Sequence, residues 1–107
     1  MALDSTLSVT VDRAITFTYT VTAGEPVELQ FTSGKMADVV VSEPSGTQVW
    51  QWGHNRMFTQ ALQKRTVTPE SPLEQTFTWS DPEPGEYVAV AELDADRSAR
   101  AETQFRV

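Results

Sequence analysis

The side chains able to do chemistry in this sequence are sparse, and the first to test is its one histidine, His54. A Ser-His-Asp triad needs that imidazole beside a serine and an acid, and the chain has no Gly-x-Ser-x-Gly elbow to supply the serine. The sequence also has no cysteine, which removes thiolate catalysis and thiol-bound metals. Its fifteen acidic residues are spread along the chain and single out no pair for acid–base catalysis. We therefore expect that the protein is not an enzyme.

Two patterns suggest metal ligands, and both are thin. His54 and Met57 lie three residues apart, with Met36 elsewhere, and some β-sandwiches bind copper through imidazole and thioether groups. Asp94 and Asp96 place two carboxylates at alternate positions, but the further acids and the glycine of a calcium loop are missing. A solvated turn is the better interpretation of that pair. We expect no metal and no cofactor, and a small metal-binding sandwich stays as an alternative.

The charge balance excludes one class of partner. The formal net charge is −7, and only two of the eight basic residues are lysines. Binding to a phosphate backbone requires clustered Lys and Arg, so we expect no nucleic-acid partner. The same balance fits either a protein kept soluble in concentrated salt or an ordinary acidic protein.

Targeting signals are the next feature. The first six residues contain no basic region and no apolar run, so the sequence predicts no signal peptide. No stretch approaches the ~20 apolar residues of a membrane helix. We expect a cytoplasmic protein with no membrane partner.

Apolar and polar residues alternate with period two almost throughout, which is typical of half-buried strands. Gly- and Pro-containing turns separate these stretches at residues 23–26, 43–46 and 81–85. The run at residues 39–41 is continuously apolar and suits a central strand buried on both faces. The predicted strands lie at residues 7–11, 15–21, 27–31, 39–41, 47–52, 66–67, 73–79, 87–93 and 101–107.

This spacing predicts an all-β fold, an immunoglobulin-like antiparallel β-sandwich of about seven to nine strands, forming a single domain over residues 1–107. Tyr87 follows a Pro-Gly turn at a strand start, which indicates a tyrosine corner, whose hydroxyl binds nearby backbone. The expected aromatic core consists of Trp50 or Trp52, Trp79, Phe17, Phe31 and Phe77.

The most informative stretch is residues 49–62. Trp50 and Trp52 are two residues apart, so a strand directs both to the same face. The chain then enters residues 53–65, which we interpret as a loop with at most one helical turn, rich in the side-chain types found in interface hot spots. A packed structural corner is the competing interpretation. The candidate partner-binding residues are Trp52, Gly53, His54, Asn55, Arg56, Met57 and Phe58, with Arg56 and Phe58 as the probing side chains.

The same stretch resembles the intracellular proteinase inhibitor (BsuPI) family. The resemblance rests on Val-Trp-Gln-Trp at residues 49–52, on Met-Phe-Thr-Gln-Ala-Leu at residues 57–62, and on residues 26–33, Trp79 and the Pro-Gly-Glu-Tyr at residues 84–87. It implies a β-sandwich and, for the founding member, inhibition of an intracellular subtilisin-type serine protease. The pattern departs from the family at residues 23–24 and 36–38.

Binding is therefore the expected mode of action. The leading hypothesis is a proteinase inhibitor that offers an ordered loop of residues 53–58 to a protease cleft. The alternative is a non-inhibitory protein-interaction or structural accessory module with the same fold. The target, the contact surface and the oligomeric state are left open by the sequence.

Overall fold

The computed structural model describes residues 3–54 and 56–107. The described chain is all-β and contains no helix, so no helix there is long and apolar enough to cross a membrane. All strand pairs are antiparallel. The strands in chain order are β1 (Leu3–Val11), β2 (Ile15–Ala23), β3 (Val27–Phe31), β4 (Ala37–Ser42), β5 (Gln48–Gln51), β6 (Gln63–Val67), β7 (Leu73–Trp79), β8 (Glu86–Leu93) and β9 (Arg100–Arg106).

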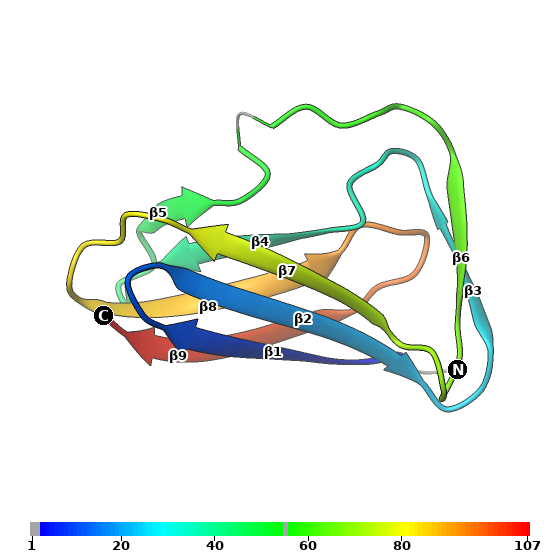
Figure 1. Cartoon of the computed structure of the whole chain (residues 1–107), viewed down its shortest axis with the longest axis horizontal. Helices are drawn as coiled ribbons and strands as arrows, with labels where there is room; N and C mark the ends of the chain where they lie inside the picture. Colours follow the sequence, from blue (N-terminus) through cyan, green and yellow to red (C-terminus); the bar gives the residue numbers. More distant parts are fainter. Residues whose placement is uncertain (1–2, 55) are drawn as a thin grey trace.

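These strands form three sheets, in the orders β1-β2-β7, β5-β4-β8-β9 and β3-β6. The two larger sheets face each other as the layers of a sandwich, with β1 alongside β9 where the layers meet (Figure 1). The β3–β6 pair stands at one end of the molecule, at a steep angle to the longer strands (Figure 1). The predicted antiparallel β-sandwich is confirmed.

The apolar and polar residues that alternate in the sequence lie on opposite faces of each strand. On β2, Ile15, Phe17, Tyr19 and Val21 are inaccessible to solvent, while the threonines between them lie on the opposite face, half-buried. Phe17 pairs directly with Phe77 of β7, so the cross-strand neighbour is also apolar. A shift of one residue would place this whole set in water, and the register is therefore strongly specified.

The structure differs from the prediction in strand bounds and in burial: β1 begins at Leu3 rather than at residue 7, and β4 is longer than residues 39–41 at both ends. Val39 and Val41 are fully buried, but Val40 is only half-buried because it lies on the outer face of its sheet; the expectation of a strand covered on both faces is wrong. The strand predicted at residues 66–67 begins earlier, at Gln63. The first residues of β6, from Gln63, are polar, so the hydrophobic pattern does not indicate where this strand begins.

One hydrophobic cluster fills the space between the sheets. Phe17, Phe31 and Phe77 are buried in it, as predicted. The tryptophans lie at its rim, half-buried, where the ring of Trp50 stacks on that of Trp79 with 5.5 Å between centroids.

The tyrosine corner is present as well. The Tyr87 hydroxyl donates to the backbone oxygen of Glu83 at 2.5 Å, four residues upstream. This bond ties the turn before β8 to the strand itself.

Candidate partner-binding loop

The candidate residues lie in the connection between β5 and β6, which crosses one side of the molecule from the larger sheet to the β3–β6 pair (Figure 1). The chain leaves β5 through two overlapping turns: His54 N–H donates to Gln51 O at 3.2 Å, and Arg56 N–H donates to Gly53 O at 3.4 Å. Asn55 lies outside the described residues. Beyond these turns, residues 57–62 form neither helix nor strand.

The start of this connection is fixed by Asp38 on β4. Its Oδ1 accepts the backbone N–H of Gly53 at 2.8 Å and that of Val39 at 2.9 Å, and its Oδ2 accepts Gln51 Nε2 at 2.7 Å. The ammonium of Lys35 lies 3.5 Å from Oδ2. With its side chain only 12% exposed, the carboxylate has its oxygens occupied by donors of the charge-assisted kind. It therefore acts as a hub that holds the first loop residue against the sheet.

Glycine at position 53 is a consequence of this hub. A Cβ atom there would lie 2.5 Å from Asp38 Oδ2 and 3.2 Å from Oδ1, closer than a side chain tolerates. Glycine allows the backbone to approach the carboxylate closely, and the Cβ of any other residue would prevent this contact.

The far end of the loop is held by the connection between β3 and β4. Gly34 N–H donates to Thr59 O at 2.8 Å, and a Cβ at position 34 would lie 2.6 Å from Thr59 Oγ1. Two residues within residues 34–38 therefore hydrogen-bond the two ends of the loop, Asp38 at Gly53 and Gly34 at Thr59, and we call this pair of contacts the two-ended grip. These bonds restrict the backbone at Gly53 and at Thr59, and a restricted backbone loses less conformational entropy when it binds a partner.

Between these anchors, Trp52 serves as a platform for its neighbours. Its indole meets Phe77 of the core edge-on, with 4.9 Å between ring centroids, and Phe58 packs against it at 5.6 Å. The guanidinium carbon of Arg56 lies 4.6 Å from the indole centroid, and Arg56 Nε donates to Trp52 O at 2.7 Å. Arg56 and Phe58 are therefore both directed toward the scaffold, the first by a cation–π contact and the second by ring packing.

Met57, between those two residues, is 98% exposed. It is the outermost apolar side chain of the candidate residues, and His54 is exposed beside the turns. Leu62, 82% exposed, stands at the other end of the connection, next to β6. The expectation that Arg56 and Phe58 probe a partner stays a prediction, while the geometry makes Met57 the side chain that presents most freely.

Over residues 3–54 and 56–107, no three His, Asp or Glu side chains gather as metal ligands. Asp96, considered above as a calcium ligand, instead clamps β3: its Oδ1 accepts Gln30 N–H at 3.0 Å, and its own N–H donates to Gln30 O at 3.1 Å. Burial raises the pKa of the Tyr19 phenol, which lies in the core and away from the loop.

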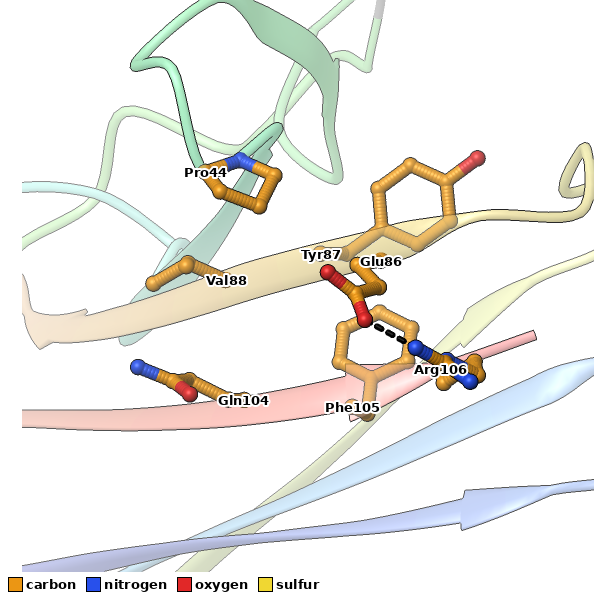
Figure 2. Close-up of a pocket in the computed structure, with 7 residues that line it drawn as sticks. All are labelled: Pro44, Glu86, Tyr87, Val88, Gln104, Phe105 and Arg106. Carbon is orange, nitrogen blue, oxygen red and sulfur yellow. Dashed lines mark hydrogen bonds and ion pairs between the residues drawn. The ribbon is translucent and has the colours of Figure 1, made fainter.

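A shallow depression of about 390 Å³ lies on the outer face of β8 and β9 (Figure 2). Glu86 and Arg106 bind each other across it as an ion pair, and the Tyr87 hydroxyl points away from the other labelled residues, toward its bond with Glu83. Its charged groups are thus already matched. The lining residues are Pro44, Glu86, Tyr87, Val88, Gln104, Phe105 and Arg106.

Comparison with known proteins decides the family. A family model described as BsuPI, intracellular proteinase inhibitor, matches residues 3–98. The chain belongs to this family. The match spans the first eight strands and the whole candidate loop, and it confirms the resemblance drawn from the tryptophan-rich stretch.

No curated protein matches this BsuPI-family chain. Among solved structures, the chain is similar to Spo0M, the sporulation control protein of Bacillus subtilis, with a TM-score of 0.53 and 12% sequence identity. The similarity covers 100% of this chain and 49% of that one, so this chain spans about half the length of Spo0M. At such identity the likeness shows the fold alone.

The BsuPI-type sequence pattern located the loop but missed its anchors. Asp38 lies in a strand stretch that differs from the family pattern, and Gly34 and Thr59 are ordinary loop residues in the sequence. Gly53 and Asp38 are 15 residues apart, so the sequence does not indicate that they interact. Their contact becomes apparent only once the strands are paired.

Proposed function

We propose that this chain is an intracellular proteinase inhibitor that binds a subtilisin-type serine protease through residues 52–58. Membership of the family supports the inhibitor class. The observation that carries the loop assignment is the two-ended grip: Asp38 holds Gly53, Gly34 holds Thr59, and Met57 stands 98% exposed between them.

An inhibitor of this type works by being ordered before it binds. A flexible segment in a protease cleft loses conformational entropy on binding and reaches a cleavable geometry easily. A segment held at both ends and packed on Trp52 loses less conformational entropy on binding. It also adopts a cleavable geometry less easily. This arrangement supports tight binding with slow turnover.

The proposal extends to the whole chain. The hydrophobic cluster draws side chains from strands of all three sheets, which supports a single folded domain over residues 1–107. The family's description as intracellular supports action in the cytoplasm on a protein partner. The protein binds its target without a metal or cofactor.

The test is a titration of purified protein against a subtilisin-type protease with a chromogenic peptide substrate. We expect inhibition at or below micromolar protein, and its absence at that concentration would refute the proposed function. Arg56→Ala addresses the loop separately: removing the guanidinium takes away the brace on Trp52, and unchanged inhibition in this variant would argue against residues 52–58 as the contact.

A second candidate is a non-inhibitory interaction module. The similarity to Spo0M supports it, since a fold of this kind occurs within a protein described as a sporulation control protein. Affinity capture from the native cytoplasm separates the two, because a protease among the captured proteins supports inhibition and a stoichiometric non-protease partner supports the module.

A further inference from the structure

We infer that Met57 is the specificity-determining side chain of this loop, and that the target is a protease whose primary pocket is apolar and uncharged. This inference rests on the proposed function and names the kind of protease it requires. The orientation of three consecutive side chains carries it.

The first step is the direction of the side chains. Arg56 and Phe58 lie on either side of Met57 in the sequence, and both pack on Trp52. The side chain between them faces solvent instead. Met57 is accordingly 98% exposed, on a chain that is pinned two residues later at Thr59.

The second step excludes the neighbours. Arg56 would have to leave both the indole face and the Trp52 oxygen, its partner at 2.7 Å, to reach a pocket. Phe58 would have to abandon its packing on the half-buried Trp52 and expose more of that indole to water. Met57 reaches outward with no contact to break, so it enters a pocket at the lowest cost in lost interactions.

The third step is the chemistry of the pocket. In serine proteases the primary pocket reads one side chain: an acidic pocket selects Lys or Arg, and a hydrophobic slot selects a large apolar group. Methionine carries an unbranched, uncharged and adaptable thioether, which fits an apolar slot and gains nothing from a carboxylate. The cationic side chains of Arg56 and Lys35 are engaged with Trp52 and Asp38.

The test compares three variants in the same inhibition assay. Met57→Ala removes the anchor, and Met57→Leu keeps its size and polarity. Leu62→Ala removes another largely exposed apolar side chain of the same connection, one that lies outside residues 52–58. Because both positions are exposed, the thermal midpoints of all three are expected to match the parent protein. For the inhibition constant, we expect a rise of about thirtyfold or more in Met57→Ala, the effect of an interface hot spot. Met57→Leu and Leu62→Ala are expected to stay within about threefold of the parent.

The outcomes separate the inference from the proposed function. If the parent inhibits and Met57→Ala inhibits equally well, or Leu62→Ala weakens inhibition as much, the role of Met57 is refuted while the inhibitor function stands. If the parent does not inhibit a subtilisin-type protease, the proposed function fails, and this inference fails with it.

Discussion

Gly53→Ala tests the link between the scaffold and the loop most directly. The new Cβ would lie 2.5 Å from Asp38 Oδ2, 3.0 Å from its Cγ and 3.2 Å from Oδ1. The carboxylate cannot remain there, and its withdrawal threatens the 2.8 Å bond from Gly53 N–H and the 2.7 Å bond from Gln51 Nε2. The backbone at Gly53 has no left-handed φ, so backbone strain does not add to the clash.

The magnitude follows from those contacts. A hydrogen bond to a charged group contributes about 1.5–3 kcal/mol, and partial relaxation recovers some of two such bonds, so we expect a loss of about 2–4 kcal/mol in the free energy of unfolding. Urea unfolding measures this loss: with an m-value of about 2 kcal/mol/M, the midpoint falls by roughly 1–2 M while m is unchanged.

The matched control is Gly24→Ala. Position 24 lies in the exposed turn between β2 and β3, has no left-handed φ, and offers a Cβ nothing within 4 Å. Alanine there restricts the unfolded chain and is expected to leave stability unchanged or raise it by about 0.4–1 kcal/mol. The contrast between the two glycines isolates the clash from the generic effect of the substitution.

A double-mutant cycle completes the test. If the new Cβ of Gly53→Ala clashes with the Asp38 carboxylate, the substitution lowers the free energy of unfolding less in an Asp38→Ala background. We expect a coupling energy of order 1–3 kcal/mol. Equal unfolding midpoints for the two glycine variants, or strict additivity in the cycle, would refute the hub described for Asp38.

Four further predictions concern the core, the loop and the surface. Tyr87→Phe deletes the donor to Glu83 O and is expected to lower the free energy of unfolding by about 1 kcal/mol in urea titrations, whereas Tyr19→Phe removes a buried hydroxyl without a hydrogen-bond partner in the described chain and is expected to cost less or to stabilise. Burial raises the pKa of Tyr19, so its neutral form stabilises the fold below about pH 10 and this contribution is lost as pH rises through the folded-state pKa; Tyr19→Phe should flatten the alkaline fall in thermal midpoint. Peroxide is expected to oxidise Met57 to the sulfoxide well before the half-buried Met36, as peptide mass spectrometry reports, and equal rates would contradict the exposed loop. Added salt screens the self-repulsion of a −7 chain, so melts across a salt series should show a rising midpoint, and a flat series would end the salt-adaptation hypothesis.

The strand framework was predictable from the sequence because it is written in local alternation. Residues 15–21 show period two in the sequence and become β2, whose apolar set is buried. The tyrosine corner was predictable for the same reason, since Tyr87 and its acceptor Glu83 are four residues apart. Val40 was mispredicted because a run of three valines does not say whether a second layer covers the sheet.

The sequence alone determined the strand pattern of a β-sandwich and located its tryptophan-rich stretch at residues 49–62. It did not determine how that loop is held. Asp38 and Gly53 are 15 residues apart, Gly34 and Thr59 lie on different connections, and Gln30 and Asp96 are 66 residues apart. Only strand pairing brings these groups within hydrogen-bond distance. The tertiary structure also showed that Arg56 and Phe58 both pack on Trp52, while Met57 is exposed to solvent.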